Sequence, residues 1–299
     1  MAVILVAGGT GFVGSHLVRS LVTEGHSVRI LSRSAKTAPD FGQAETVSGD
    51  VTDTDSLLAA VEGCAAVVMA AQFPGHPVER RRKGFTYDAV DRAGTENLLA
   101  ASVAAGAERF LYVSGAGVGA GRSEEWFVAK EAAERAVRES GLEWLILRPS
   151  WAYGPEDKAL DRIARIARWS PVVPVLGWKS QRVMPVLADD IGLAVAAAFA
   201  NPGTWNCTYE IGGPDVMTMK EVVETLLDVM GKRRLLVPAP KPLMKIAAWP
   251  ISLLPNGFLS PRAVDFATGD AVVDNSGVVE QLDLKPRRLD EGLRTYMAS

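Results

Sequence analysis

A glycine-rich turn follows the first apolar run of the chain and precedes a stretch with helical periodicity. Its glycines fit two spacings at once, G-x-G-x-x-G from Gly9 and G-x-x-G-x-x-G from Gly8. Glycine lets the backbone approach a pyrophosphate closely, and the free amides at the start of the next helix favour negative charge. We therefore expect a dinucleotide phosphate to bind along the turn, which consists of Gly8, Gly9, Thr10, Gly11, Phe12, Val13 and Gly14.

The end of the second apolar run carries a cation. An NAD-selective site holds an Asp or Glu about 20 residues after the glycine turn, where it binds the ribose 2′-hydroxyl. Here the sequence has Ser32 and Arg33 instead. A guanidinium and a hydroxyl suit a 2′-phosphate, so the predicted cofactor is NADP(H), with NAD(H) less favoured.

A further polar position follows the third apolar run. Asp50 can accept a hydrogen bond from the adenine amino group, with Val51 beside the ring. Thr52, Asp53 or Thr54 can equally cap the helix that follows, and the two interpretations are compatible.

The elements that position these residues alternate up to about residue 150. Short apolar runs are followed by longer segments of helical period, which is typical of strand-helix units around a parallel sheet. We predict six strands, at residues 3–7, 27–31, 45–47, 65–70, 109–114 and 144–148. Helices are expected at residues 12–24, 86–105 and 123–140. The pattern predicts an α/β fold with a Rossmann-type, doubly wound parallel sheet.

The 299 residues divide into two parts by composition. Residues 1–150 are expected to form the NAD(P)-binding Rossmann domain. Prolines punctuate shorter elements after Pro149, which indicates a smaller α/β lobe at 151–299 for a substrate or partner. We expect this lobe to be interleaved with the sheet rather than to fold independently.

Charge and cysteine content narrow the classes of function. The net charge of −3 gives no general attraction to nucleic acid, and the basic run 80–83 has no aromatic stacking platform beside it. The two cysteines, Cys64 and Cys207, form neither a metal-ligand spacing nor a disulfide framework. We therefore expect no metal and no nucleic-acid partner.

A reducing compartment, the cytoplasm, fits this cysteine usage best. The sequence begins directly with a predicted strand, so we expect no leader peptide. No apolar stretch reaches the roughly 18 to 20 residues of a spanning helix. Residues 243–254 are apolar enough to contact a membrane surface, although packing against their own domain is the favoured expectation.

The motifs together resemble the extended and atypical short-chain dehydrogenase/reductase superfamily, which includes epimerase/dehydratase-like proteins. The likeness covers nearly the whole chain. Besides the glycine turn, it rests on Asp50, residues 90–99, Lys130, residues 148–155 and residues 185–191. The resemblance implies that Ala70 and Ala71 line the ribose side, that Ser114 is among the cofactor-binding residues, and that Lys130 grips the nicotinamide ribose.

The catalytic pattern of that superfamily is incomplete here. Active members carry a Tyr four residues before the Lys, where it serves as the proton donor or acceptor. Position 126 is Trp126, whose indole cannot relay a proton near neutral pH, and Gly115 aligns with the family serine. Tyr153 is our first substitute, because the loop after the sixth predicted strand should border the cleft, and Tyr87 and His76 follow it.

The C-terminal third resembles bacterial relatives of the NADPH-binding accessory subunit of respiratory complex I, whose members also tend to lack the tyrosine. The main hypothesis is an NADP(H)-binding atypical short-chain dehydrogenase/reductase, an oxidoreductase without the usual Tyr. The alternatives are a non-catalytic NADP(H)-binding subunit or assembly factor, and an NAD-dependent sugar epimerase/dehydratase-like enzyme. The substrate and any protein partner stay open.

Overall fold

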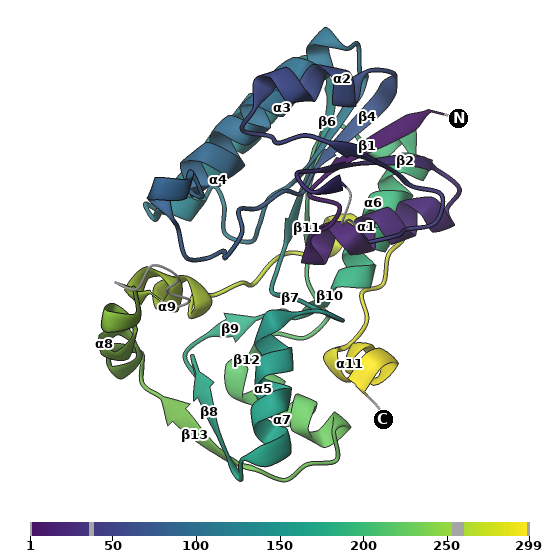
Figure 1. Cartoon of the computed structure of the whole chain (residues 1–299). Helices are drawn as coiled ribbons and strands as arrows, with labels where there is room; N and C mark the ends of the chain where they lie inside the picture. Colours follow the sequence, from purple (N-terminus) through teal and green to yellow (C-terminus); the bar gives the residue numbers. More distant parts are fainter. Residues whose placement is uncertain (1, 36–38, 253–259, 298–299) are drawn as a thin grey trace.

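The computed structural model describes residues 2–35, 39–252 and 260–297 (Figure 1). Within these residues, seven strands form one sheet in the order β11-β6-β5-β4-β1-β2-β3, and every neighbouring pair is parallel. The strands are β1 Val3–Ala7, β2 Ser27–Ser32, β3 Glu45–Ser48, β4 Cys64–Met69, β5 Arg109–Val113, β6 Glu143–Pro149 and β11 Cys207–Ile211. The predicted doubly wound α/β sheet is confirmed.

Helices cover both faces of this sheet, so its central strands, such as β1 and β4, are apolar on both sides. Ile4 and Val6 of β1 pack on the face covered by α1, α6 and α10, whereas Leu5 and Ala7 pack on the face covered by α2, α3 and α4 (Figure 1). The helices are α1 Phe12–Thr23, α2 Leu57–Val61, α3 Gly94–Ala104, α4 Glu125–Arg138, α6 Ala188–Ala200 and α10 Ser276–Gln281.

The six predicted strands are all present, and the structure adds a seventh from beyond residue 150. Strand β11 pairs in parallel with β6, with Cys207 opposite Leu145 and Ile211 opposite Pro149. The strand is short and follows a turn, so the sequence shows little that distinguishes it from the surrounding loops. The later part of the chain therefore completes the edge of the sheet as well as forming the lobe.

The helix predicted at residues 86–105 is two elements. A π-helix runs over Tyr87–Ala93, and α3 continues it from Gly94. The Thr86 side chain accepts a hydrogen bond from the Ala89 amide and caps the start. The wider turn alters which side chains face the sheet, and such π-turns often occur at functional sites.

The second lobe consists of paired short strands and helices below the carboxyl-terminal edge of the sheet (Figure 1). The strand pairs are β7 Ala152–Tyr153 with β10 Val186–Leu187, β9 Arg182–Val183 with β12 Met217–Thr218, and β8 Val172–Leu176 with β13 Leu235–Ala239. The helices are α5 Lys158–Trp169, α7 Met219–Val229, α8 Lys241–Ser252, α9 Pro261–Ala267 and α11 Leu289–Met297.

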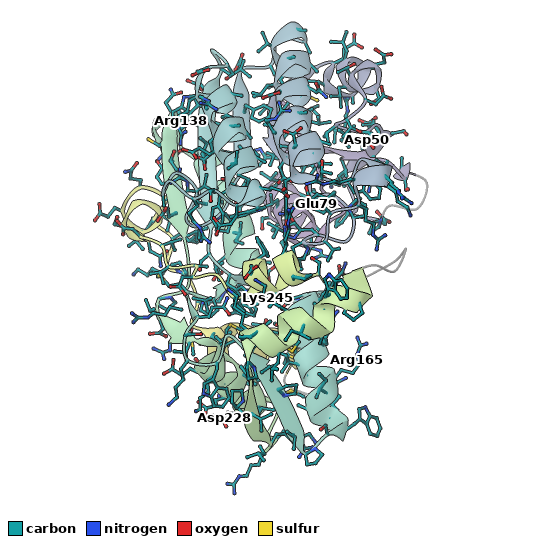
Figure 2. The ribbon with its side chains drawn as sticks, turned by 90° about the vertical axis from the view of Figure 1, so that its left-hand side faces the viewer. Asp50, Glu79, Arg138, Arg165, Asp228 and Lys245 are labelled. Carbon is teal, nitrogen blue, oxygen red and sulfur yellow. The ribbon has the colours of Figure 1, made fainter. Side chains whose placement is uncertain are left out.

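Helix α8 turns one face to the protein and another to solvent. Ala248 is buried, and Lys245, labelled in Figure 2, pairs with Asp265 of α9 at 2.8 Å. Leu243 and Ile246 are each more than half exposed. The expected packing of residues 243–254 on their own domain thus holds for one face of α8, while residues 253 and 254 lie outside the described part.

Candidate functional site

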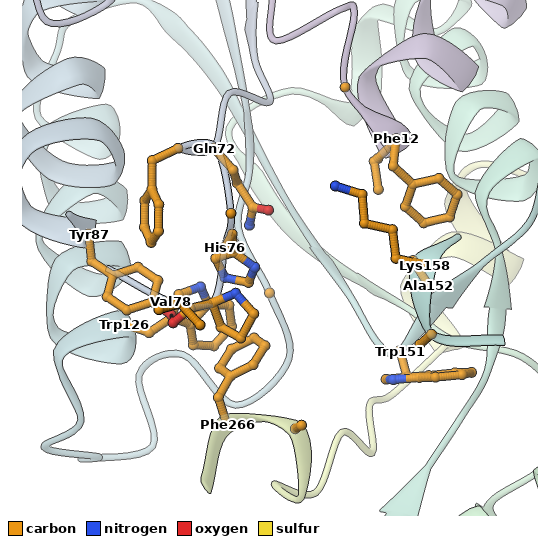
Figure 3. Close-up of a pocket in the computed structure, with 18 of the residues that line it drawn as sticks. Phe12, Gln72, His76, Val78, Tyr87, Trp126, Trp151, Ala152, Lys158 and Phe266 are labelled. Atoms are coloured by element: carbon orange, nitrogen blue, oxygen red, sulfur yellow. Dashed lines mark hydrogen bonds between the residues drawn. The ribbon is translucent and has the colours of Figure 1, made fainter. Parts of the chain in front are cut away.

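A cleft of about 1760 Å³ separates the carboxyl-terminal edge of the sheet from the second lobe (Figure 3). The turns after β1, β2, β4, β5 and β6 line one wall, because parallel strands end at the same edge. Helices α5 and α9 contribute to the opposite wall. Small-ligand pockets typically have volumes of roughly 300–1,000 Å³, so this cleft has room for a dinucleotide and a second molecule.

The glycine turn lies at the centre of the cleft wall, and two of its glycines are required by their surroundings. Gly8 has a φ of +85°, and a Cβ there would lie 2.6 Å from the Ala71 backbone. A Cβ on Gly14 would clash with the carbonyl oxygen of Gly8. Gly9 does not line the cleft, since it packs below the turn, where a Cβ would meet Val18. Of the two spacings, G-x-x-G-x-x-G from Gly8 therefore describes the cleft wall.

The amides at the start of α1 face this cleft. The helix begins at Phe12, and no side chain in the described part of the chain caps its first turn. Thr10, Gly11, Phe12, Val13 and Gly14 all line the cleft, as predicted from the sequence. An uncapped helix start with flanking glycines presents free N–H groups to an anion.

The helix α1 is anchored behind the cleft by a buried polar contact. Nδ1 of His16 lies 2.5 Å from Oδ1 of Asp189, at the start of α6. This hydrogen bond holds the pKa of Asp189 below its usual range. The contact joins the glycine turn to the junction that precedes α6, which the resemblance also singled out at residues 185–191.

The other end of the cleft holds the residues predicted for the adenosine half. Nε of Arg33 lies 4.0 Å from Oδ2 of Asp50, and the guanidinium stacks over the Phe85 ring at 5.5 Å. Asp50 accepts hydrogen bonds from the amide and hydroxyl of Thr52, so its carboxylate also holds the turn. The sequence-predicted residues Ser32, Arg33, Asp50, Val51, Ala70 and Ala71 all line the cleft.

Lys130 is buried rather than exposed in the cleft. Its Nζ lies 3.1 Å from Oδ1 of Asp91 and donates hydrogen bonds to the Tyr112 hydroxyl and the Val113 carbonyl, each at 3.2 Å. Burial opposes the charge on Lys130, but Tyr112 and Asp91 outweigh it and raise the pKa of the ammonium. The structure thus places Lys130 behind the cleft wall, among groups that already satisfy it.

Trp126 covers this buried lysine and explains the glycine that aligns with the family serine. The Lys130 ammonium lies 5.8 Å from the centre of the Trp126 ring. A Cβ on Gly115 would lie 2.5 Å from Cη2 of Trp126. The indole therefore fills the space that a side chain at position 115 would need, so Trp126 and Gly115 depend on each other sterically.

Ser114 lines the cleft, but its hydroxyl is committed elsewhere. Oγ of Ser114 donates to Oε1 of Glu134 at 2.6 Å, and Arg148 donates to both oxygens of that carboxylate. Burial raises the pKa of Glu134, but the hydrogen bonds from Arg148 and Ser114 outweigh it and hold it below its usual range. A hydroxyl bonded to a charged carboxylate is a poor substitute for the missing proton donor.

Tyr153 does not reach the cleft, so the prediction that it borders the cleft is wrong. The side chain is fully buried in the core of the second lobe, and it packs against Gly292 of α11. Its hydroxyl points toward the carbonyls of Arg288 and Leu289. The chain alternates direction along β7, so Ala152 faces the cleft and Tyr153 faces away.

The other two substitutes, Tyr87 and His76, do line the cleft (Figure 3). The Tyr87 hydroxyl donates to the Pro77 carbonyl at 3.2 Å, and burial raises the pKa of the phenol well above its usual range. Burial and, secondly, the charge of Lys130 lower the pKa of His76 to about 3, so its ring is neutral. Nε2 of His76 is buried without a hydrogen-bond partner among the described residues.

The second lobe adds site residues that the sequence analysis did not find. Phe266 of α9 packs edge-on against His76 at 4.9 Å and against Trp126 at 5.3 Å (Figure 3). Trp151 and Lys158 also line the cleft. Phe266 lies in a segment without a recognisable motif, and only the packing of α9 brings it to the cleft. Lys158 follows the quoted 148–155 motif, so its position after that motif was a usable signal.

Within the described residues, no cluster of three or more His, Cys, Asp or Glu side chains can hold a metal ion. The described helices also include none that is long and apolar enough to span a bilayer.

Comparison with known proteins agrees with this geometry. A family model described as NAD(P)H-binding matches residues 8–165, which is more than half of the chain. NADH dehydrogenase [ubiquinone] 1 alpha subcomplex subunit 9, mitochondrial, of Arabidopsis thaliana is 30% identical over 95% of this chain and 74% of its own. The 3 beta-hydroxysteroid dehydrogenase/Delta 5-->4-isomerase of Mycobacterium tuberculosis is 29% identical over 91% of this chain and 82% of its own.

Solved structures show the same fold. MoeE5 in complex with UDP-glucuronic acid and NAD has a TM-score of 0.76 at 24% identity, over 98% of this chain and 97% of its own. The Rossmann sheet, the glycine turn and the sequence relatives agree with one another. This chain belongs to the NAD(P)H-binding family and has the fold of the epimerase/dehydratase-like, extended short-chain dehydrogenases/reductases.

Proposed function

We propose that this chain binds NADP(H) in the cleft. In this arrangement the pyrophosphate lies at the start of α1, adenine lies beside Asp50 and Val51, and the ribose side follows Ala70 and Ala71. The observation that carries the choice of NADP(H) is Arg33, whose side chain is 46% exposed at the end of β2, where an NAD-selective site would place an acid. Its long contact with Asp50 leaves guanidinium donors for a 2′-phosphate.

Replacing Arg33 with Ala is expected to weaken NADPH binding by about 10- to 100-fold, the range for one hydrogen bond to a charged group. NADH binding should change by less than about threefold, because NADH has no 2′-phosphate. Calorimetric titration of both nucleotides measures this, supported by the thermal stabilisation that each provides.

The control is Arg135→Ala, because Arg135 is exposed on α4, away from the cleft. An equal loss for both nucleotides in Arg33→Ala would remove the reason for naming NADP(H).

Within this proposal, the chain acts as an NADP(H)-dependent oxidoreductase on a small molecule. The bound nucleotide supplies or accepts a hydride at its nicotinamide ring. The volume of the cleft supports a second ligand beside it, between the sheet edge and α5. Trp151 and Ala152 are placed to contact that ligand (Figure 3).

We propose that His76 takes over the polarising role of the missing tyrosine as a hydrogen-bond donor. The alkoxide formed by hydride transfer takes its proton from water, because the neutral imidazole has no acidic proton near pH 7. Of Tyr153, Tyr87 and His76, only His76 combines a place in the cleft wall with a ring nitrogen that has no partner among the described residues. The neutral ring can donate a hydrogen bond to a carbonyl oxygen as charge develops on it. The test is turnover of carbonyl, enone and quinone compounds with NADPH, which His76→Phe should abolish without weakening NADPH binding.

A non-catalytic NADP(H)-binding subunit is the second candidate. The coupled Trp126 and Gly115 pair favours it, because the indole occupies the place of both usual catalytic side chains. The relative from Arabidopsis thaliana, which is named as a subunit of NADH dehydrogenase, supports a role as a subunit. Stabilisation by NADPH without any turnover in that screen would support this candidate over the first. A sugar epimerase would need the same tyrosine chemistry, so we do not favour that alternative.

We also propose that the protein works in the cytoplasm, or in another reducing compartment, with a peripheral contact to a membrane. Both cysteines are free thiols, and Cys64 is buried beside Arg29. The exposed apolar side chains of Leu243 and Ile246 on α8 support the membrane contact.

A further inference from the structure

Lys158 occupies an unusual position for a cation. It is the first residue of α5, immediately after Asp157, whose carboxylate caps the helix by accepting from the amides of Ala159 and Leu160. The positive end of a helix dipole disfavours a lysine there. Helix stability therefore does not account for the ammonium at this position.

The side chain of Lys158 extends into the cleft toward Phe12, the first residue of α1 (Figure 3). It is exposed, and it forms no ion pair or hydrogen bond with any described residue. The starts of two helices and one unpaired ammonium thus meet across the same part of the cleft.

We propose that Lys158 binds the dinucleotide pyrophosphate from the second lobe, opposite the start of α1. Each phosphate of the pyrophosphate carries about one negative charge. A helix start offsets only about half a charge, so the α1 amides alone leave most of the pyrophosphate charge unbalanced. Lys158 supplies a full charge at that point. The assignment rests on the proposed nucleotide site and adds a contact from outside the Rossmann sheet, which joins the two lobes around the ligand.

The test compares Lys158→Met with wild type in the full chain, using NADPH, ADP-ribose and adenosine 2′-monophosphate as ligands. NADPH and ADP-ribose should bind about tenfold more weakly, whereas adenosine 2′-monophosphate, which has no pyrophosphate, should bind equally well. The matched control is Lys179→Met, an exposed lysine of the same lobe outside the cleft lining.

Unchanged affinity for both NADPH and ADP-ribose would overturn the assignment, as would an equal loss for all three ligands. If wild type bound none of them, the proposed nucleotide site itself would fail, which is a separate outcome.

A different observation concerns the tip of the second lobe, defined here as Trp169, Val172 and Leu235 with the cations around them. Trp169 ends α5 and is 87% exposed, and Leu235 begins β13 and is 65% exposed. Leu235 pairs with Val172 of β8. Arg234 donates to the Ala167 carbonyl at 2.7 Å, which fixes the start of β13 against the end of α5.

Four exposed cations lie within four residues of Trp169 or Leu235 in the chain: Arg165, Arg168, Lys232 and Arg233. None of their side chains forms an ion pair with a described residue. Asp228, at the lower end of Figure 2 with Arg165, is the exposed acid nearby in the sequence. The tip is therefore locally positive in a chain whose net charge is −3.

We infer that the tip of the second lobe docks on an anionic membrane surface. Tryptophan is enriched where its ring meets lipid headgroups, and each nearby Lys or Arg adds attraction to anionic lipid. The apolar group of three side chains is smaller than the roughly 800 Å² per partner of a stable protein interface, whereas insertion between headgroups needs no such area. The contact is peripheral.

Flotation with phosphatidylcholine vesicles, with and without about 30% phosphatidylglycerol, tests this at about 0.1 M salt. Wild type should bind the anionic vesicles at least about tenfold more tightly than the neutral ones. Trp169→Ala and Arg168→Glu should each lose most of that binding. Arg135→Glu, at an exposed and unpaired arginine of α4, is the matched control and should bind as wild type does.

Failure of wild type to float with anionic vesicles would overturn the inference. Binding of the protein to soluble polyglutamate as tightly as to anionic vesicles would also overturn the inference, because the tip would then recognise an acidic chain rather than a lipid surface.

Discussion

Replacing Lys130 with Met is expected to lower the free energy of unfolding by about 3–5 kcal/mol, the cost of removing one partner of a buried ion pair. The ammonium is fully enclosed and lies 3.1 Å from Asp91, which is itself buried. Without the ammonium, the Asp91 carboxyl must either stay charged in an apolar setting or take up a proton. Urea denaturation at pH 7 measures the loss.

The double variant Lys130→Met, Asp91→Leu is the control for this prediction. Replacing both charges with apolar groups should recover most of the lost stability, because no charge is left buried. A cost below about 1 kcal/mol for Lys130→Met would contradict the buried pair. NADPH affinity distinguishes two roles for Lys130. If Lys130 holds the ribose directly, the double variant should bind NADPH more weakly than wild type. If its role is structural, the affinity should be unchanged.

Acidification from pH 7.5 to pH 5 should remove about 2 kcal/mol of stability through His76 alone. Burial, and secondly the charge of Lys130, lower the pKa of this imidazole to about 3 in the folded chain. An ordinary histidine titrates near 6.5, so between about pH 6.5 and pH 3 the unfolded chain binds the extra proton. The stability is therefore complete above about pH 6.5 and is lost as the pH falls.

His76→Phe should flatten this acid limb, since phenylalanine has no proton to bind and still packs against Tyr87 and Phe266. The measurement is the free energy of unfolding of both proteins at pH 7.5 and pH 5. His26→Phe, at a half-buried histidine that packs on Phe199, is the control and should keep the wild-type dependence. An unchanged acid limb in His76→Phe would show that the imidazole is not held neutral by its surroundings.

Local sequence patterns predicted the Rossmann half well. All six predicted strands are present. A central strand buried on both faces needs an uninterrupted apolar run such as Val3–Ala7, and its turn needs glycine wherever the backbone comes too close for a Cβ. The same patterns could not locate β11. A five-residue segment becomes a strand there only because the edge of β6 is free to pair with it.

For the catalytic residues too, the sequence predicted some features and only the structure decided others. The sequence shows that Trp126 and Gly115 replace the usual side chains, but only the packed structure shows that one ring fills both places. The loop after β6 is near the cleft, as expected, yet the alternation of β7 turns Tyr153 into the lobe core. A shift of one residue along a strand reverses the direction of a side chain, and spacing alone does not fix that register.

By itself, the sequence determined six of the seven strands of the sheet, the glycine turn and the cation at the end of β2, because each depends on residues close together in the chain. Tertiary structure decided which distant groups meet at the site: Phe266 over His76, Lys158 opposite Phe12, and Lys130 paired with Asp91. Those contacts join segments far apart in the chain. They depend on how whole helices pack, which local periodicity does not encode.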